Sequence, residues 1–321
     1  MSETPLHMMR GNRALPAPLE RALNAALSRG PGYEPTPIGP NFDGTSVRGY
    51  YVDFRAKTTS PVAGDAASLP AIQLIQLALG WWERHVAGED GARERVLELC
   101  GAVEERSVAE GAERLWPVNV AVPKYGLAPG WFSALPQGQA ASVFVRAHLS
   151  TREDRYAELA RSAIEPFLHG APSPLLSPGP VLEEAPSTPA SHILNGWMSA
   201  LWGVWDVQLG LDDGRARDLF GASVDRLRAS LSDYDTGWWT LYSLYPHPIA
   251  DLAKPIYHRF HVTQLDVYHR LTGYGEFADT RERWAGYDRP AHRVRAVAQK
   301  AGFAVAESRR RRRWERSHAE R

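Results

Sequence analysis

Apolar residues recur at three- and four-residue steps along most of the chain beyond residue 67. Such spacing is typical of amphipathic helices, which bury one face and expose the other. In the first stretch the spaced residues are Ile72, Leu74, Ile75, Leu77, Ala78 and Trp82. Further helices are expected near 92–106, 137–149, 153–168, 191–209, 214–231, 257–272 and 276–286. The chain is therefore predicted to be mainly α-helical.

The connections between these helices differ in length. Those near 170–190 and 233–256 are long and contain prolines. Long loops without secondary structure of their own are uncommon in compact domains and are usually functional. Helices in sequential pairs, with long loops on alternate connections, favour an α/α barrel (toroid) whose loops meet at one mouth. No self-similar period is visible, so any repetition is structural only.

The N-terminal region differs from the helical part. Residues 1–65 are rich in proline and glycine over much of their length and predict an N-terminal arm. A short helix is expected near Leu19–Leu27, and weak alternation over 47–58 predicts a short strand or hairpin. Minor β-hairpin elements are therefore expected beside the helices.

The α/α-barrel domain is expected to occupy residues 66–290. Residues 291–321 follow as a C-terminal basic tail that contains the run Arg309–Arg313. Blocks of like charge are usually disordered, so we expect a disordered tail. The alternative is an arm that grips polyanions.

The bulk composition excludes some partners. Lys plus Arg and Asp plus Glu both number 37, so the formal net charge is zero with histidine neutral. This balance gives no electrostatic case for binding nucleic acid or a membrane surface. No apolar run approaches the length of a membrane span, and we see no signal peptide, so a cytoplasmic protein is expected. The single cysteine, Cys100, has apolar neighbours and predicts a buried, unreactive thiol.

Two segments concentrate groups that can transfer protons. Residues 181–196 place Glu183 and Glu184 in a proline-bounded loop before an aromatic helix. Residues 237–265 carry, among tryptophans, Tyr242, Tyr245, Tyr257, His258 and His261. Most of the eleven tryptophans are expected in the core, and a few could stack on sugar rings. A carboxylate and several phenols around such a pocket suit proton transfer on a sugar.

A polar stripe is expected on the helix that begins at Pro255, a favoured first helical position. Tyr257, His261, Gln264 and Tyr268 would then share one face. Such a stripe is costly to bury without partners. It is either the wall of a pocket or a hydrogen-bonded network in the core.

The acidic pair and two amides also have structural interpretations. Glu183 and Glu184 could favour the positive end of the next helix, which Ser191 could cap. Gln137 and Gln139 flank a glycine that permits close approach by backbone or ligand. Their amides could bind sugar hydroxyls or satisfy loop backbone.

Other chemistries are poorly supported. The sequence has no glycine-rich phosphate loop, dinucleotide fingerprint, His-Glu-x-x-His pair or Gly-x-Ser-x-Gly elbow. The histidine spacings include no zinc-like set of cysteines or acidic residues. We therefore expect neither a cofactor nor a metal.

Four stretches together resemble the C-terminal helical domain of the D-glucuronyl C5-epimerases. They are Gly130–Ala134 with Gln137–Ala140, Glu183–Gly196, Tyr234–Gly237 with Tyr242, and Tyr257–His261 with Gln264–Leu265. These stretches lie in the family's order and span roughly residues 115–290. The combination is specific, although no single piece is.

The resemblance implies a uronate 5-epimerase, which inverts carbon 5 of glucuronic acid residues in a heparosan-like polysaccharide to give iduronic acid. It implies no redox cofactor, and it favours a homodimer. Such a site must stabilise charge that develops on the sugar carboxylate and needs proton carriers on both faces of the ring. The family pattern places Glu184 and Tyr257 as the opposed pair, with Tyr242 as a supporting donor or relay.

Substrate-binding candidates complete the predicted site. Those for the sugar carboxylate are Lys124, Asn195, His258 and Arg259, and the others are Trp131, Gln137, Gln139, Tyr245 and His261.

The sequence departs from the family pattern at Ala185, which stands where the family commonly has a tyrosine. Tyr245 is a candidate replacement phenol. Three outcomes follow: a slower epimerase, an enzyme for another uronate, or a carbohydrate-binding relative without catalysis. A polysaccharide lyase, which starts from the same proton abstraction and then expels the 4-oxygen, is the alternative enzyme.

Overall fold

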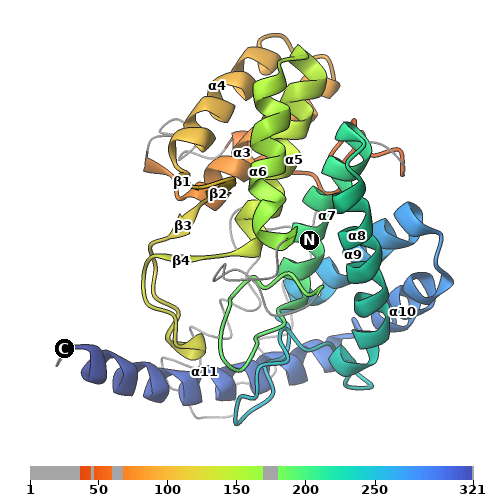
Figure 1. Ribbon diagram of the computed structural model, residues 1–321. Coiled ribbons are helices and arrows are strands. Elements are labelled where there is room, and N and C mark those ends of the chain that lie inside the picture. The colour runs from red at the N-terminus through yellow and green to blue at the C-terminus, as the bar shows by residue number, and fades with distance from the viewer. Residues whose placement is uncertain (1–36, 45–46, 60–67, 169–179, 320–321) are drawn as a thin grey trace.

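Helices dominate the fold (Figure 1). The computed structural model describes residues 37–44, 47–59, 68–168 and 180–319. Its helices are α2 (Arg55–Thr58), α3 (Ala71–Val86), α4 (Ala92–Glu105), α5 (Ala134–Thr151), α6 (Asp154–Leu168), α7 (Leu194–Leu211), α8 (Gly214–Ser230), α9 (Pro255–Thr272), α10 (Gly275–Ala285) and α11 (Pro290–Ala319). The mainly helical class is confirmed, and the helix expected near Leu19–Leu27 lies outside the described residues. None of the described helices is long and apolar enough to cross a membrane.

Consecutive helices pack against each other in pairs. The pairs are α3 with α4, α5 with α6, α7 with α8, and α9 with α10. The first members of the pairs also contact one another in chain order, α3 with α5, α5 with α7 and α7 with α9. The predicted pairing is therefore present, and closure of the row into a toroid stays a prediction.

Glycines allow the central helices α5 and α7 to approach closely. A Cβ at Gly138 would overlap the Ala200 carbonyl oxygen, and one at Gly203 would overlap the Gly138 carbonyl oxygen. Gly138 thus serves backbone packing. The surrounding core is rich in large aromatic side chains, and those that are fully buried include Trp116, Trp197, Trp202, Trp239 and Trp284. Cys100 on α4 is fully buried as well, as predicted.

The strand or hairpin expected over 47–58 is wrong. This segment consists of bends followed by α2. Tyr50, Tyr51 and Val52 are buried in succession, whereas a half-buried strand would alternate. The Tyr50 amide donates to the Glu83 carboxylate on α3 instead of to a strand partner. Buried aromatic side chains therefore override the weak alternation.

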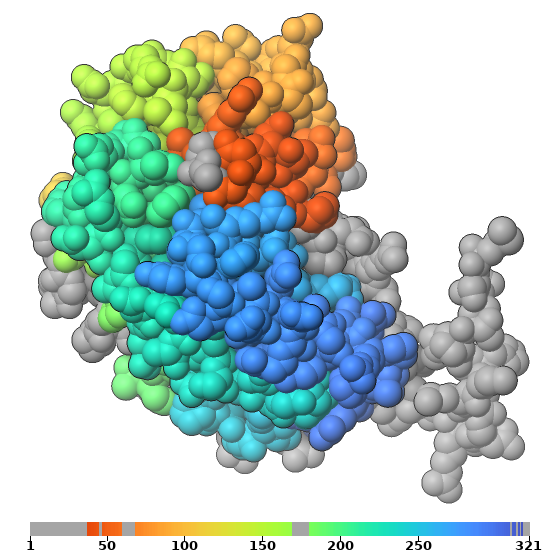
Figure 2. All heavy atoms as spheres, turned by 90° about the vertical axis from the view of Figure 1, so that its right-hand side faces the viewer, coloured from red at the N-terminus to blue at the C-terminus, as the bar shows by residue number. Residues whose placement is uncertain are grey.

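The same segment connects several helices. The Gly49 carbonyl accepts a hydrogen bond from Arg146 of α5 at 2.8 Å, and the Tyr51 hydroxyl donates to Asp206 of α7. Just before the segment, a Cβ at Gly44 would contact the Arg270 side chain of α9. Figure 2 shows this segment, in red to orange, beside the blue atoms of the later helices. It thus joins the first and last helical pairs.

Two small hairpins separate α4 from α5. Strand β1 (Val108–Glu110) pairs antiparallel with β2 (Glu113–Leu115). Strand β3 (Pro117–Val118) pairs antiparallel with β4 (Trp131–Phe132), and the loop between them contains the 3-10 turn η4 (Pro123–Tyr125). Minor β-hairpin elements are therefore present, although not over 47–58, and the loop of the second hairpin carries Lys124 to the site described below.

The expected disordered tail is wrong for the residues that the structure describes. Helix α11 continues to Ala319 and crosses the base of the molecule in Figure 1. Its apolar side chains at Ala296, Val297, Ala301 and Phe303 are buried. Arginine and alanine favour helix, so the charged run extends a helix that packs by its apolar side.

The N-terminus of α8 offers a test of local stability. The Asp213 carboxylate accepts hydrogen bonds from the Arg215 and Ala216 amides at 3.0 and 3.1 Å. Asp213→Ala should therefore lower the free energy of unfolding by about 1 kcal/mol, measured by chemical denaturation. Asp213→Asn keeps the acceptor and should stay close to wild type. Equal losses in both variants would assign the effect to the Arg161–Asp213 ion pair instead.

Candidate active site

The first glutamate of the acidic pair holds its loop in place. The Glu183 carboxylate is buried and accepts hydrogen bonds from the Ser191 hydroxyl at 2.7 Å and the His192 amide at 2.9 Å. It also pairs with the His192 ring. Ser191 therefore serves this loop and does not cap α7, which begins at Leu194.

The second glutamate lies against the first turn of α7. A Cβ at Gly196 would overlap the Glu184 carboxylate, so glycine leaves the space that this group occupies. Burial raises the pKa of Glu184 to about 7; Lys124 opposes the rise, Glu183 adds to it, and a hydrogen bond with Tyr242 opposes it. Glu184 Oε2 is buried without a hydrogen-bond partner among the described residues. This carboxyl group can therefore exchange a proton near neutral pH.

Two tyrosines lie side by side next to Glu184. The ring centroids of Tyr242 and Tyr257 are 5.1 Å apart. The Tyr242 backbone carbonyl accepts a hydrogen bond from the Leu194 amide at 3.2 Å, which fixes the position of Tyr242. Tyr257 lies in the first turn of α9. Burial raises the pKa of both phenols, that of Tyr257 to about 12, and the Glu184 charge raises both further. Both phenols therefore hold their protons at neutral pH and can donate.

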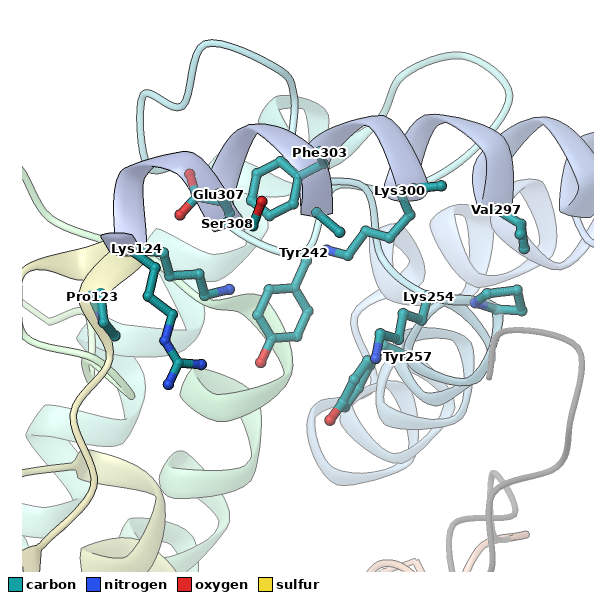
Figure 3. Close-up of a pocket in the computed structure, with 14 residues that line it drawn as sticks. Pro123, Lys124, Tyr242, Lys254, Tyr257, Val297, Lys300, Phe303, Glu307 and Ser308 are labelled. Carbon is teal, nitrogen blue, oxygen red and sulfur yellow. The ribbon is translucent and has the colours of Figure 1, made fainter. Parts of the chain in front are cut away.

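A cavity of about 600 Å³ opens between the tyrosine pair, η4 and α11 (Figure 3). This volume lies in the range of about 300–1,000 Å³ that is usual for small-molecule sites. The lining residues used below are Lys124, Tyr242, Lys254, Tyr257, Lys300, Phe303, Glu307 and Arg311. In Figure 3 both phenolic hydroxyls point away from α11. Glu184 is not among the lining residues, and the hydrogen bond with Tyr242 connects it to the cavity.

Lys124 lines the cavity, as its predicted role in carboxylate binding requires. Its Nζ is 3.3 Å from Asp251 Oδ2 and 5.0 Å from the centre of the Tyr242 ring. Its charge also opposes the rise in the pKa of Glu184, so it acts electrostatically on that carboxyl group. Lys124 therefore places a positive charge at the cavity and near the Glu184 carboxyl group.

A second aromatic cluster borders the tyrosine pair. It contains Val122, Tyr125, Leu127, Trp131, Ala185, Ile193, Tyr242 and Tyr245. Trp131 Nε1 donates to the Val120 carbonyl at 2.8 Å, and the Tyr245 hydroxyl accepts from Arg310 at 2.9 Å. The structure thus brings Trp131 and Tyr245 close to Tyr242, but neither lines the cavity.

The two predicted sugar-binding amides lie inside the protein. Gln137 donates to the Arg114 and Ala163 carbonyls at 2.7 and 2.8 Å. Gln139 accepts from Gln76 at 3.2 Å. Both side chains are buried and neither lines the cavity. The structure therefore does not bring them to the site, because protein groups already occupy their hydrogen-bonding atoms.

His258 and His261 of α9 also belong to the core. His258 contacts the Thr240 hydroxyl at 2.9 Å and the Trp284 carbonyl at 3.0 Å, and His261 lies 3.2 Å from the same hydroxyl. Burial lowers the pKa of both rings, that of His258 to about 4. Neutral, buried rings are poor partners for a sugar carboxylate. The polar stripe of α9 is thus largely the core network that was its alternative explanation.

Two other carboxylate-binding candidates lie outside the cavity lining. Arg259 is 3.8 Å from Asp288. Asn195 is buried in the first turn of α7, beside Gly196, and its Oδ1 has no hydrogen-bond partner in the described part of the chain. Asn195 therefore neighbours the Glu184 contact without facing the cavity.

Sequence reasoning missed two lysines at this site. Lys254 and Lys300 line the cavity together with Lys124. The whole sequence contains four lysines, and the fourth is Lys57 on α2. The rarity of lysine was a usable signal, but the three positions are far apart in sequence and only the fold brings them together.

Comparison with known proteins supports the resemblance seen in the motifs. A D-glucuronyl C5-epimerase of Caenorhabditis elegans is 31% identical over 193 residues, which cover 53% of this chain and 30% of that protein. The structure of cellobiose 2-epimerase from Spirochaeta thermophila covers 72% of this chain and 71% of that one, with a TM-score of 0.49 and 12% identity. A likeness this weak has no bearing on the reaction.

The family match covers the centre of the site. Residues 110–286, more than half of the chain, match the family described as D-glucuronyl C5-epimerase C-terminus. Glu184, Tyr242, Tyr257 and Lys124 lie within this range, whereas Lys300 lies beyond it. The chain therefore belongs to the D-glucuronyl C5-epimerase family.

Proposed function

We propose that the protein is a uronate 5-epimerase that interconverts D-glucuronic and L-iduronic acid residues in a heparosan-like polysaccharide. Its family supports an epimerase. The matched segment covers 30% of the Caenorhabditis elegans relative, so the reaction is argued from the residues of this chain. The observation that carries the proposal is a carboxyl group with a pKa of about 7, Glu184, beside two phenols and a lysine-lined cavity.

The proposed reaction moves one proton off carbon 5 and another onto it. The C5–H bond of glucuronate breaks, its proton passes to the Glu184 carboxylate, and the electron pair spreads into the sugar carboxylate. The Tyr257 phenol then donates a proton to carbon 5 from the opposite face, which forms the new C5–H bond with inverted configuration. Solvent reprotonates the phenolate and takes the proton from Glu184. Iduronate reacts by the reverse sequence.

The environment of each group suits its proposed role. A general base works best when its pKa lies near the working pH, as burial arranges for Glu184. Tyr257 keeps its proton and is available as a donor. Tyr242 forms a hydrogen bond with Glu184 and is proposed as a supporting proton donor or relay. The Lys124 charge stabilises the negative charge that develops on the sugar carboxylate.

Ala185 does not leave the site without phenols. Its side chain is 2% exposed and packs with Tyr125 in the second aromatic cluster. Tyr245, the candidate replacement, lies in the same cluster and accepts a hydrogen bond from Arg310. The phenols that line the cavity are Tyr242 and Tyr257, and we propose that the reaction runs with these two.

Proton NMR of heparosan incubated with the protein in deuterated water tests the function. Epimerisation predicts deuterium at carbon 5 together with new iduronate signals. An unsaturated uronate would show a lyase instead, and binding without either change would show a non-catalytic carbohydrate-binding relative.

The pH dependence tests the base assignment. Glu184 must be ionised to accept the proton, so kcat/KM should rise with pH and level off above about 7. Below the pKa of this group the rate should fall about tenfold per pH unit, because only the ionised fraction reacts. Deuterium exchange at a series of pH values measures the profile. A flat profile between about pH 5.5 and about pH 8.5 would exclude Glu184 as the base.

A further inference from the structure

The fold gathers the few lysines of this chain around one space. Three of the four, Lys124, Lys254 and Lys300, line the cavity. They come from η4, from the residue before α9 and from α11 (Figure 3). Most of the 37 basic residues are arginines. A lysine offers a compact charge on a flexible stem, which suits contact with an anion inside a cavity.

Two of these lysines share a single carboxylate. Asp251 is buried, with Oδ2 3.3 Å from Lys124 Nζ and with Oδ1 in contact with Lys300 Nζ. Burial lowers the pKa of Lys300; Asp251 opposes this, and the charges of Lys124 and Lys254 add to it. The three ammonium groups therefore act on one another. The lining carries four cations, Lys124, Lys254, Lys300 and Arg311, against Glu307 and the adjacent Asp251. This surplus leaves positive charge that a bound anion would balance.

Helix α11 forms one wall of this cavity. Lys300, Phe303, Glu307 and Arg311 all line it, because their spacing of three and four residues places them on one face. Glu307 lies 4.0 Å from Arg310 and 3.4 Å from the His247 ring, and Arg311 is a further cation of this wall. Lys300 lies beside the tyrosine pair, with its Nζ 5.4 Å from the Tyr242 ring centre. This wall lies beyond the family match, which ends at residue 286.

The chemistry of the cavity fits an acidic sugar. The rings of Tyr242, Tyr257 and Phe303 offer apolar surface beside the ammonium groups. Carbohydrate rings carry C–H groups that pack on such surface, and a carboxylate accepts charge-assisted hydrogen bonds from ammonium groups. A neutral sugar would leave the positive charge unbalanced. The ligand class indicated is therefore a sugar acid.

We propose that Lys300 binds a uronate carboxylate of the polysaccharide, which makes α11 a substrate-binding element. The identity of the sugar rests on the proposed function, whereas the need for an anion rests on the surplus of positive charge around the cavity. The sugar carboxylate and Asp251 would together balance Lys124 and Lys300. Asp251 is then a positioning residue that holds both ammonium groups at the cavity.

Lys300→Met tests this proposal, because it removes the charge and keeps an apolar stem. Its affinity for heparosan, measured by titration calorimetry, should fall about tenfold or more. Lys57→Met removes the lysine outside the cavity and should bind like wild type. A Lys300→Met variant that binds heparosan as tightly as wild type would overturn the proposal.

A second ligand separates charge recognition from structural damage. Wild type should bind heparosan whose carboxyl groups have been reduced to primary alcohols more weakly than it binds heparosan. Lys300→Met and wild type should bind this reduced polymer with equal affinity. If Lys300→Met lowers the affinity for heparosan and for the reduced polymer by the same factor, the proposal is overturned. If Lys300→Met does not fold, Lys300→Gln compared with Lys300→Arg supplies the same contrast, with affinity retained only in the arginine variant.

The exchange assay distinguishes this proposal from the proposed function. Wild type that binds heparosan through Lys300 without exchanging the carbon 5 proton would refute the epimerase and support this carboxylate site. Epimerisation with unchanged KM and affinity in Lys300→Met would support the epimerase and refute this role for α11.

Discussion

Glu184→Gln is expected to slow the conversion of glucuronate to iduronate about 100- to 10,000-fold, the usual contribution of a general base. The amide keeps the volume that Gly196 leaves open but cannot accept the carbon 5 proton. The rate is measured by the growth of iduronate signals from heparosan. Heparosan affinity should change little, because the amide has the size of the carboxyl group and the lysines that line the cavity are retained.

The stability of the same variant provides the control. Burial raises the pKa of Glu184 from 4.5 to about 7, so the folded protein holds this proton more tightly than the unfolded chain. The stabilisation from this group is complete below the unfolded pKa and is lost as pH rises through the folded one. At about pH 8 wild type carries a buried charge that glutamine lacks, so Glu184→Gln should melt at the same or a higher temperature. A lower melting temperature would attribute the lost activity to misfolding.

The helical part of the fold could be predicted from apolar spacing where a helix buries one face, as α4 and α8 do. Spacing was insufficient where tertiary contacts decide the structure. Tyr50 and Tyr51 are buried in succession by contacts with α3 and α7, which no local alternation encodes. The run Arg309–Arg313 suggested disorder, but it belongs to α11, whose earlier apolar residues Ala296, Val297, Ala301 and Phe303 are buried.

The site residues, too, could be predicted from sequence only in part. Family motifs located Glu184, Tyr242 and Tyr257, and the fold places these three together. A motif cannot say which way a polar side chain faces, so Gln137 and His258 were grouped with them although both satisfy protein partners. The lysines were missed for the opposite reason. Each lies alone in sequence, and their shared contact with one cavity exists only in three dimensions.

Tyr257→Phe is expected to reduce iduronate formation by about 100- to 10,000-fold, since it removes the proposed donor on the opposite face. The phenyl ring can still line the cavity and pack on Tyr242, so heparosan should still bind. Exchange should respond differently from inversion. Glu184 can remove the carbon 5 proton of glucuronate and return a deuteron to the same face, so deuterium should enter unreacted glucuronate while iduronate fails to appear.

This separation of exchange from inversion is specific to a donor on the second face. Tyr274→Phe, which removes an exposed phenol at the start of α10, should leave both rates unchanged. If exchange and inversion fall together in Tyr257→Phe while binding is retained, Tyr257 must act in the first proton transfer, on the same side as Glu184. If both rates stay at the wild-type level, Tyr257 carries no proton, and Tyr242, which bonds to Glu184, becomes the phenol to test on the opposite face.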